Sequence, residues 1–476
     1  MNINPILTCD SYKISHPKQY PDNMMYMHSY IESRGGEYGY TKFFGLQYYL
    51  KKYLTVRLTK EMVDEASEIF KLHGIPFIRE DFDYIVEKLD GKIPLRIRAV
   101  EEGAIIPNHN VLITVESTDK NVPYIVSWFE TLLLKTWYPI TVATYSYKIK
   151  QIIKYFLEKT CDNVDEEILF KLHDFGYRGT SSEESAGIGG LAHLTNFLGT
   201  DNIKALVYGR HYYNIDCAGF SIPAAEHSTI TSWGRENEKK AIEHIIDSFK
   251  DNQLAVVCDS YNFFNAVEHI ICEDLKDKII KRDNLLVIRP DSGDAITNIL
   301  FALEKLENAF GVTINKKGYK VLNHVRIIQG DSVYENTVWD ILKSITDMGY
   351  SAENISLGSG GALLQGNKNS SINRDTHRFA MKCSSVKIKD SFVDVYKDPI
   401  TDKGKISKKG RLDLIIDENE KIRTINITNL GENNYHKDSI MNIVFENGEL
   451  LKEYSLEEIR ENECKYYKPH LEKRPF

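Results

Sequence analysis

Three short polar segments of this chain combine residue types that bind phosphate and sugar hydroxyls. Arg289-Pro-Asp-Ser-Gly293 offers a guanidinium, which can hold a phosphate through two hydrogen bonds, and a carboxylate, which can hold ribose hydroxyls or a metal. Gly330-Asp331 places another carboxylate beside a glycine, and Gly358-Ser-Gly-Gly361 presents backbone N–H groups that an anion can approach closely. A lone glycine cluster is more often a tight turn, but the three segments together favour an anion-binding site.

Two other segments carry ring side chains. Phe175 can stack on a planar ring while Arg178, three residues later, meets a phosphate. Considered locally, a buried turn with a structural ion pair is the simpler interpretation of this segment. His227 lies beside Glu226 in a run rich in hydroxyl residues, where a single histidine is more often structural than catalytic.

Several classes of protein are disfavoured by motifs that the chain lacks. Neither standard nucleotide-binding fingerprint occurs, that is, no GxxxxGK[ST] loop and no GxGxxG after a strand. Asp174-Phe-Gly176 matches a kinase triplet, but no kinase glycine-rich loop or HRD element accompanies it. The 7 cysteines are odd in number and form no CxxC pair, which argues against a disulfide framework and a cysteine zinc site and predicts a cytoplasmic location.

Basic residues are frequent after residue 370. A solvated face is the default explanation for such a run, although the same residues can form the positive wall of a polyphosphate pocket. The run consists of Lys382, Lys397, Lys405, Lys408 and Lys409, with Arg374, Arg378 and Arg411 nearby.

Length and composition limit the number of domains and the possible classes of partner. A chain of 476 residues has room for two or three domains, and 42% hydrophobic with 27% charged residues is an ordinary globular composition. The net charge of −8 lacks the broad basic footprint of a nucleic-acid binder, so no nucleic-acid partner is expected. No stretch approaches the roughly 18–20 apolar residues of a membrane span, and the polar start does not resemble a signal peptide, so no membrane partner is expected.

The elements that must position these side chains alternate between apolar strands and helices. Each predicted strand runs into a polar loop and most of these loops into a helix, a pattern typical of a parallel sheet covered by helices, in which functional groups gather at the carboxyl ends of the strands. We therefore expect an α/β fold with an irregular (β/α) barrel over residues 166–374. Residues 1–165 and 375–476 are expected to form one mixed α+β domain from both ends of the chain. The predicted barrel strands are residues 254–258, 285–288, 325–328 and 355–357.

Taken in order, these segments resemble the nicotinamide phosphoribosyltransferase family, a group of type II phosphoribosyltransferases. The resemblance runs over essentially the whole chain, with similar spacing, and includes Asp10-Ser-Tyr-Lys13 and Lys171-Leu-His-Asp-Phe-Gly-Tyr-Arg-Gly179. The other matching segments are residues 16–21, 44–47, 137–144, 221–230, 259–261, 288–293, 328–331, 358–365 and 408–411.

The resemblance implies a reaction and an assembly. The phosphoribosyl group of 5-phosphoribosyl 1-pyrophosphate would pass to the ring nitrogen of nicotinamide, giving nicotinamide mononucleotide and pyrophosphate in the salvage of NAD. Mg²⁺ would bridge pyrophosphate oxygens, without a cage of protein ligands. The family also implies a homodimer with two active sites at the interface and ATP as a co-substrate.

The resemblance also implies roles for matching residues around nicotinamide. Phe175 would stack on one face of the ring and Tyr12 of the other subunit on the opposite face. Asp201 would accept a hydrogen bond from the carboxamide, which favours the amide over nicotinic acid, because an acid meets a like charge and offers no donor. Asp10 would lie near this pocket, and Arg289 at the base and phosphate.

Further implied roles concern phosphates and ATP. His227 would be phosphorylated by ATP, and hydrolysis of the phosphohistidine would drive synthesis, with Asp259 orienting the imidazole. Ribose hydroxyls would be held by Asp291, Gly330 and Asp331, and the resemblance also assigns Asp291 to catalysis. The 5′-phosphate would be bound by Arg178, Gly360, Gly361 and Arg374. Pyrophosphate or the ATP phosphates would be bound from across the interface by Arg34, Lys382, Lys397 and Lys405.

Three departures from the animal members of the family indicate a bacterial or phage member. Gly366-Asn-Lys-Asn-Ser370 resembles an additional loop before Arg374. Ala255 and Ala380 stand where those members often carry serine, so ligands that hydrogen-bond there would lose a partner.

Two alternatives stay open. A nicotinate phosphoribosyltransferase shares the fold and the phosphate contacts, but Asp201 and Tyr12 argue against it. A catalytically silent binding or signalling protein can retain the same fold, and the preserved set of Arg178, His227, Asp291 and Arg374 argues against such decay.

Overall fold

The computed structural model describes residues 3–401 and 406–469 and divides the chain into two compact units. The terminal unit contains residues 3–144, 211–215 and 373–469 as far as they are described, and the barrel unit contains residues 145–210 and 216–372. The division falls within helix α6 (Trp137–Thr160) and just before Arg374. The predicted domain limits of 1–165 with 375–476, and of 166–374, stay a prediction.

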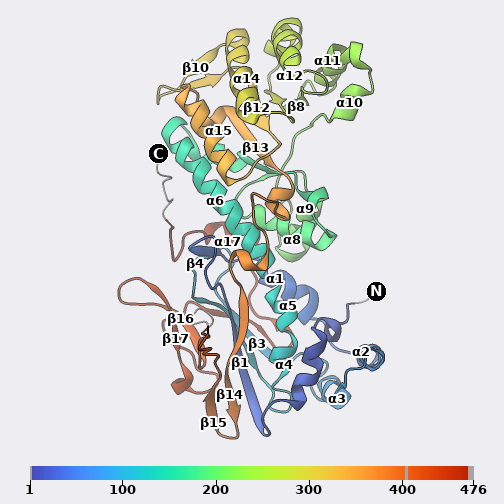
Figure 1. Ribbon diagram of the computed structural model, residues 1–476, viewed down its shortest axis with the longest axis vertical. Helices are drawn as coiled ribbons and strands as arrows, with labels where there is room; N and C mark the ends of the chain where they lie inside the picture. Colours follow the sequence, from blue (N-terminus) through green and yellow to red (C-terminus); the bar gives the residue numbers. More distant parts are fainter. Residues whose placement is uncertain (1–2, 402–405, 470–476) are drawn as a thin grey trace. The chain divides into compact units, whose positions relative to one another are not determined.

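Six parallel strands form the sheet of the barrel unit (Figure 1). All their neighbour pairings are parallel, and strands adjacent in the sheet follow one another in the sequence except where the sheet passes from β6 to β13. In sheet order they are β7 (Gly199–Thr200), β6 (Leu172–Asp174), β13 (Ile355–Ser359), β12 (Val325–Gln329), β9 (Leu286–Arg289) and β8 (Leu254–Val257).

The segment 220–225 connects the two edges of this sheet. At one edge the Thr200 N–H donates to the carbonyl of Phe220 at 3.0 Å. At the other edge the Ala225 N–H donates to the carbonyl of Ala255 at 2.9 Å. The curled sheet with this connecting segment is the predicted irregular (β/α) barrel, and the prediction of the fold class is confirmed.

The longer helices cover the barrel because apolar residues recur along one face, as in α14. In α14 (Ala295–Phe310) the buried positions include Ile299, Leu303 and Leu306, and the Asp294 side chain caps the helix by accepting from the Thr297 N–H at 2.8 Å. The expected alternation of strand, polar loop and helix is confirmed here, because α14 follows the loop after β9 and another helix follows the loop after β12. The other α-helices of this unit are α7 (Val164–Glu167), α8 (Glu183–His193), α9 (Ile203–Tyr212), α10 (His227–Thr231), α11 (Glu238–Ser248), α12 (Phe263–Asn265), α13 (Lys276–Ile280), α15 (Glu335–Asp347) and α16 (Gly361–Leu364). The last residues of α9 belong to the terminal unit. Strands β10 (Val312–Ile314) and β11 (Lys320–Leu322) form a hairpin.

The terminal unit is built on a seven-stranded sheet to which both ends of the chain contribute. Figure 1 shows β1, in blue, beside β14, in orange, and the two pair antiparallel although more than 300 residues separate them. This pairing confirms the predicted mixed α+β domain formed by both ends. In sheet order the strands are β15 (Ser391–Asp394), β14 (Ala380–Ile388), β1 (Met24–Glu32), β5 (Val111–Ser117), β3 (Leu95–Ala99), β18 (Asn442–Glu446) and β19 (Glu449–Leu450).

Smaller elements complete the terminal unit. Two separate strand pairs accompany the large sheet, β2 (Tyr40–Lys42) with β4 (Ile105–Pro107) and β16 (Leu412–Ile416) with β17 (Ile422–Asn426). The helices are α1 (Leu46–Tyr49), α2 (Lys60–His73), α3 (Arg79–Lys88), α4 (Ile125–Trp128), α5 (Glu130–Leu134), α17 (Leu456–Glu461) and the 3-10 segment η2 (Ser11–Lys18).

Arg411 does not belong to a solvated basic face. Its side chain is fully buried in the terminal unit, where Nε donates to the Tyr26 hydroxyl at 3.0 Å and Nη2 lies 3.3 Å from Glu116 Oε1. Lys408 pairs with Glu32, which is also buried. The basic residues after residue 370 therefore do not share one environment, and the default explanation of the run as a solvated face does not describe Arg411.

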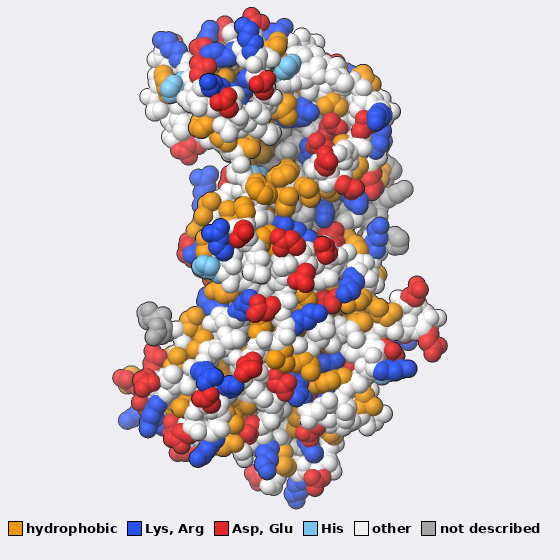
Figure 2. All heavy atoms as spheres, turned by 180° about the vertical axis from the view of Figure 1, so that it is seen from behind, with side chains coloured by type: hydrophobic (Ala, Val, Ile, Leu, Met, Phe, Trp, Pro, Cys, Tyr) orange, Lys and Arg blue, Asp and Glu red, His pale blue; other side chains and the backbone are white. Residues whose placement is uncertain are grey.

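The surface carries charges of both signs. On the face shown in Figure 2, acidic and basic side chains are interspersed. Within residues 3–401 and 406–469, none of the helices combines the length and the apolar character that a membrane span requires.

Candidate active site in the barrel unit

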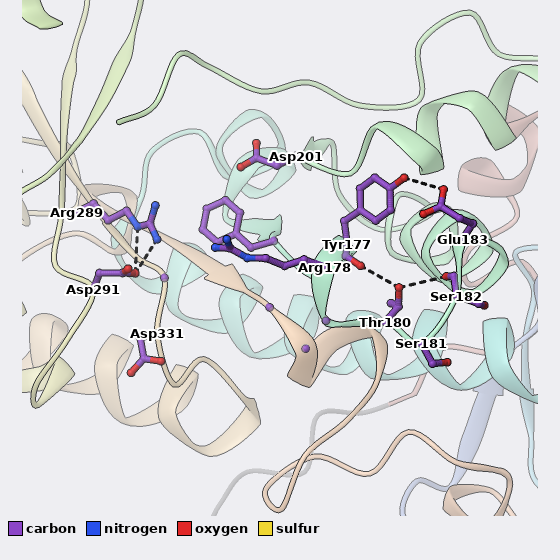
Figure 3. A pocket seen from close by; sticks show the side chains of 15 residues that line it. Tyr177, Arg178, Thr180, Ser181, Ser182, Glu183, Asp201, Arg289, Asp291 and Asp331 are labelled. Atoms are coloured by element: carbon purple, nitrogen blue, oxygen red, sulfur yellow. Dashed lines mark hydrogen bonds and ion pairs between the residues drawn. The ribbon is translucent and has the colours of Figure 1, made fainter. Parts of the chain in front are cut away.

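A cavity of about 930 Å³ opens at the carboxyl ends of the barrel strands, and its volume suits a nucleotide-sized ligand (Figure 3). Strands β6, β7, β9, β12 and β13 all end at this cavity, as expected for parallel strands that meet at one edge of a barrel. Its lining residues are Phe175, Tyr177, Arg178, Gly179, Thr180, Ser181, Ser182, Glu183, Asp201, Arg289, Asp291, Gly330, Asp331, Gly360 and Gly361.

Phe175 provides an aromatic wall that neighbouring backbone holds in place. It follows β6, and its N–H donates to the carbonyl of Ser359 at the end of β13, at 2.9 Å. A side chain at Gly358 would place its Cβ 2.0 Å from the Phe175 ring, so only glycine leaves room for the ring there. The guanidinium of Arg289 lies 5.5 Å from the ring centroid, within range of a cation–π contact.

Asp201 follows β7 and is held through one oxygen. His173 Nε2 lies 3.0 Å from Asp201 Oδ1, and the Ser221 hydroxyl donates to the same oxygen at 2.5 Å. Burial alone would raise the pKa of Asp201, but the hydrogen bonds and charge of His173, the Ser221 hydroxyl and the charge of Arg289 outweigh it, so the pKa lies below its ordinary value. Asp201 is therefore an ionised carboxylate at neutral pH.

Arg289 and Asp291 form an ion pair at the end of β9. Arg289 Nη2 and Nε both reach Asp291 Oδ1, at 2.7 and 3.2 Å. Both side chains remain about one-fifth exposed, so each can still contact a ligand in the cavity. Gly330 lies against this pair, because an added Cβ would lie 3.2 Å from Arg289 Nε and 3.3 Å from Asp291 Oδ1.

The other end of the cavity is built for an anion. Arg178 lies in the 3-10 turn η5 (Tyr177–Gly179), is exposed, and in Figure 3 extends along the pocket toward Arg289 and Asp291. A Cβ at Gly179 would lie 2.9 Å from Gly361 Cα, so glycine here lets the loops after β6 and β13 meet closely. The cavity thus combines an exposed guanidinium with closely packed glycines, residue types suited to a phosphate.

His227 is the first residue of α10, and its partner, Asp259, lies shortly after the end of β8. Its Nε2 lies 2.9 Å from Asp259 Oδ1, while Ser292 Oγ donates to Asp259 Oδ2 at 2.5 Å. The His227 side chain is 47% exposed and that of Asp259 only 4%, so the carboxylate is a buried support for an accessible ring. The adjacent Glu226 contacts Ser228 instead. With Nε2 facing the carboxylate, Nδ1 is the ring nitrogen left for another group.

A second cavity of about 290 Å³ shares Phe175, Asp201 and Arg289 with the first. It lies on the side of His173 and is mainly apolar in its lining, with Phe170, Phe220, Ile222, Ala224, Ala255, Val287 and Ile328 among the residues. Ala255, where a serine had been expected from the family, thus lines this second cavity.

The remaining predicted site residues lie in the terminal unit. Burial lowers the pKa of Lys382; Glu130 opposes this shift, and the neighbouring cations Arg34, Lys13 and Lys397 add to it. Such mutual repulsion marks a cluster of positive charge suited to an anion. A cavity of about 280 Å³ is lined by Arg34, Glu130, Leu134, Arg374, Phe379, Ala380, Met381, Lys382 and Lys397.

Three further predicted residues need separate mention. The Tyr12 side chain is 56% exposed on η2, and the Asp10 carboxylate accepts from the Thr131 hydroxyl at 2.7 Å. Lys405 lies outside the described residues. The structure therefore gathers Phe175, Arg178, Asp201, Arg289, Asp291, Gly330, Asp331, Gly360 and Gly361 at one cavity of the barrel unit, with His227 and Asp259 as a pair in that unit and Asp10, Tyr12, Arg34, Arg374, Lys382 and Lys397 in the other.

Sequence reasoning did not assign several residues of this region. His173 and Ser221 were part of quoted segments but received no role, and the hydrogen-bond partner of His173 is Asp201, not the adjacent Asp174. Tyr177 and Glu183 join across the cavity rim at 2.9 Å. The rule that strand ends converge applies to His173, which lies in β6, and to Tyr177, shortly after β6. Ser221 and Glu183 do not follow the end of a strand, and no local signal marks them.

Comparison with solved structures defines the class. The fold is similar to the crystal structure of nicotinate-nucleotide pyrophosphorylase from Pyrococcus furiosus, with a TM-score of 0.61 at 15% identity, covering 97% of this chain and 95% of that one. It is also similar to human nicotinic acid phosphoribosyltransferase, with a TM-score of 0.56 at 14% identity, covering 97% and 94%. The chain thus has the fold of these two proteins.

Sequence comparison then gives the family. Residues 170–448 match the nicotinate phosphoribosyltransferase (NAPRTase) family, and residues 4–97 match the nicotinamide phosphoribosyltransferase N-terminal domain. A nicotinamide phosphoribosyltransferase of Xanthomonas campestris pv. campestris (strain 8004) is 47% identical over 460 residues, which is 96% of this chain and 97% of that protein. One from Mycoplasma genitalium (strain ATCC 33530 / DSM 19775 / NCTC 10195 / G37) is 32% identical over 86% and 95%. The chain belongs to the nicotinamide phosphoribosyltransferase family.

Proposed function

We propose that the protein transfers the phosphoribosyl group of 5-phosphoribosyl 1-pyrophosphate to nicotinamide, releasing nicotinamide mononucleotide and pyrophosphate for NAD salvage. The observation that carries this proposal is the juxtaposition of an aromatic wall, Phe175, with an ionised and oriented carboxylate, Asp201, in a cavity whose far end holds Arg178 and glycines. Two relatives of the chain are named nicotinamide phosphoribosyltransferases, which supports nicotinamide as the substrate.

In this proposal the pyridine ring lies against Phe175 and its carboxamide N–H donates to Asp201. Stacking on the ring contributes apolar contact, and the Arg289 guanidinium lies beside the same ring. An ionised Asp201 repels the carboxylate of nicotinic acid, which also lacks an N–H to donate. This contact thus selects the amide.

Phosphoribose would occupy the rest of the cavity. Arg178 with Gly360 and Gly361 would bind the 5′-phosphate, while Asp291 and Gly330-Asp331 would hold ribose hydroxyls. As the bond from C1 to the pyrophosphate oxygen breaks, C1 gains positive character and the lone pair of the nicotinamide nitrogen forms the new bond. The nitrogen needs no general base, so the residues act by orienting the reactants and stabilising charge.

Mg²⁺ would enter with the pyrophosphate group. Within the described part of the chain, no three His, Cys, Asp or Glu side chains gather as a metal site. The carboxylates of Asp291 and Asp331 nevertheless line the cavity, and such donors fit Mg²⁺, which commonly combines substrate phosphates with one or two carboxylates. When bound, the ion would neutralise charge on the leaving group.

ATP hydrolysis would be coupled to synthesis through His227. The γ-phosphoryl group would pass to Nδ1, the nitrogen not engaged by Asp259, releasing ADP, and water would later hydrolyse the phosphohistidine to phosphate. Asp259, itself fixed by Ser292, would orient the ring and stabilise its charge. The exposed ring over a buried carboxylate supports this role.

The active enzyme would be a homodimer in the cytoplasm. The cationic cavity of Arg34, Lys382 and Lys397 and the exposed ring of Tyr12 would serve the partner subunit's barrel, with Lys405 and Asp10 in the same shared site. The 7 cysteines are unpaired, which suits a reducing compartment.

A base-competition assay tests the proposal. Purified protein with Mg²⁺ and 5-phosphoribosyl 1-pyrophosphate should convert nicotinamide to its mononucleotide in preference to nicotinic acid. The Asp201→Ala variant should lose about tenfold of this preference, the worth of one charged hydrogen bond. Preferential use of nicotinic acid by the unaltered protein would assign it as a nicotinate phosphoribosyltransferase, and an unchanged preference in Asp201→Ala would refute the proposed contact.

A further inference from the structure

The carboxylate of Asp201 has one oxygen engaged and one free. Both contacts to its side chain, from His173 Nε2 at 3.0 Å and from the Ser221 hydroxyl at 2.5 Å, end on Oδ1. Among the described residues, no donor is within hydrogen-bond distance of Oδ2. The Asp201 side chain is 46% exposed and lines the main cavity. Two donors on one oxygen fix the rotation of the carboxyl group and so fix where the other oxygen points.

His173 makes this contact from outside the main cavity. It lies in β6, lines the second cavity but not the main one, and its side chain is only 13% exposed. Its ring is 5.0 Å from the ring of Phe175, centroid to centroid. The contacts of His173 with residues of the main cavity are thus those to Asp201 and Phe175.

The His173 ring is itself positioned by Gly199. The two residues are paired across the parallel strands β6 and β7. A Cβ at Gly199 would lie 2.7 Å from His173 Nδ1, closer than such atoms approach in proteins, so glycine alone leaves space for the ring in this orientation. Strand pairing, glycine and imidazole therefore form one support behind the carboxylate.

We infer that His173 is a positioning residue that aims Oδ2 of Asp201 at the carboxamide of nicotinamide and thereby sets the preference for the amide over the acid. The inference rests on the proposed function. With Nε2–H donating to Oδ1, the free oxygen faces the ligand with its acceptor orbitals in a fixed direction. Supporting contacts of this kind maintain the geometry that a binding residue needs. Since His173 does not touch the reacting atoms, it should affect binding of the base and not the transfer step.

Replacing His173 separates positioning from a general structural role. His173→Ala removes the donor, so the KM for nicotinamide should rise about tenfold, kcat should change less than about twofold, and the amide-over-acid preference should fall about tenfold. His173→Gln retains an N–H donor at a similar distance from the backbone. It should recover most of the preference that His173→Ala loses.

Gly199 offers an independent route to the same effect. Gly199→Ala should displace the intact imidazole and raise the KM for nicotinamide much as His173→Ala does. In the double variant, His173→Ala with Gly199→Ala, the ring is gone and the added methyl group meets nothing of His173. The double variant should therefore be no worse than His173→Ala alone, a strongly non-additive result. Gly39→Ala, whose added Cβ would have no atom within 4 Å, is the matched control and should behave as the unaltered protein.

The outcomes distinguish this inference from the proposed function. An unaltered protein that makes no mononucleotide from nicotinamide would overturn the proposed function and this inference with it. If the unaltered protein uses nicotinamide but His173→Ala keeps its KM and preference, only the inference fails. It also fails if kcat alone falls, if His173→Gln loses the preference as fully as His173→Ala, or if the Gly199 and His173 effects simply add. Should His173→Ala fold poorly, the His173→Gln and Gly199→Ala measurements decide the question.

Discussion

Two places, one in each unit, use the same charged residue types in opposite ways. In the terminal unit, Arg411 is fully buried and its donors reach Glu116, Tyr26 and backbone carbonyls. Burial would raise the pKa of Glu116, but His28, Arg411 and Tyr26 together lower it to about 2. In the barrel unit, Arg178 is exposed at a cavity, and Asp201 accepts hydrogen bonds through Oδ1 while Oδ2 stays available to a ligand.

This difference teaches how to separate structural charges from functional ones. A buried charge is tolerated only when its partners satisfy it, and removing one partner strands the other. A charge that must bind a ligand keeps some of its hydrogen-bonding capacity unused at a cavity. Residue type and sequence neighbourhood do not distinguish the two cases, whereas exposure and partner geometry do.

The largest expected effect is on stability, in the terminal unit. Arg411→Met should lower the free energy of unfolding by about 3–5 kcal/mol, because Glu116 then stays buried without its guanidinium. Chemical denaturation measures this change. The control is Arg423→Met, whose exposed guanidinium pairs with Asp417 at 2.6 Å and should cost less than about 1 kcal/mol. Equal losses of unfolding free energy in the two variants would contradict the structural role of the buried Arg411.

A smaller effect, on activity alone, is expected in the barrel unit. Arg178→Ala should lower kcat/KM about 100-fold through loss of a phosphate contact, while the free energy of unfolding changes by less than about 0.5 kcal/mol. Steady-state kinetics and denaturation on the same preparation check both parts. Lys343→Ala removes a cation from an exposed helix pair and should leave kcat/KM unaltered. A destabilised Arg178→Ala, or one that retains full activity, would contradict the assignment of Arg178 as a ligand-binding charge.

The smallest expected effect concerns ATP. His227→Ala should abolish the stimulation of mononucleotide synthesis by ATP and the transfer of label from γ-labelled ATP to the protein, with some basal transfer remaining. His269→Ala is the matched control, because His269 also faces a carboxylate at 2.9 Å but lies exposed on a helix face. That variant should respond to ATP normally. Stimulation that survives in His227→Ala would remove His227 from the coupling.

Much of the barrel could be predicted from the sequence because its strands are short apolar runs followed by polar loops. The helix α2 also carries local signals, since the Thr59 side chain caps its start and Gly74, at a φ of +83°, ends it. What the pattern could not give was long-range pairing. The antiparallel match of β1 with β14 and the separation of β2 and β4 as their own pair depend on contacts between distant segments.

The candidate site shows the same limit at the level of side chains. Phe175, Asp201 and Arg178 were assigned through family resemblance, and the cavity brings them together. The contact of His173 with Asp201 joins residues 28 apart, and no local motif announces it. Likewise, Arg411 looked like part of a basic surface, because a sequence does not reveal which cation a sheet will bury.

A crystal structure with nicotinamide mononucleotide bound would test the central claim most directly. The pyridine ring should lie between Phe175 and the partner subunit's Tyr12, with the carboxamide nitrogen within about 3 Å of Asp201 Oδ2. The 5′-phosphate should lie at Arg178, Gly360 and Gly361. A nucleotide bound elsewhere, or a ring at Phe175 with its carboxamide turned away from Asp201, would contradict it.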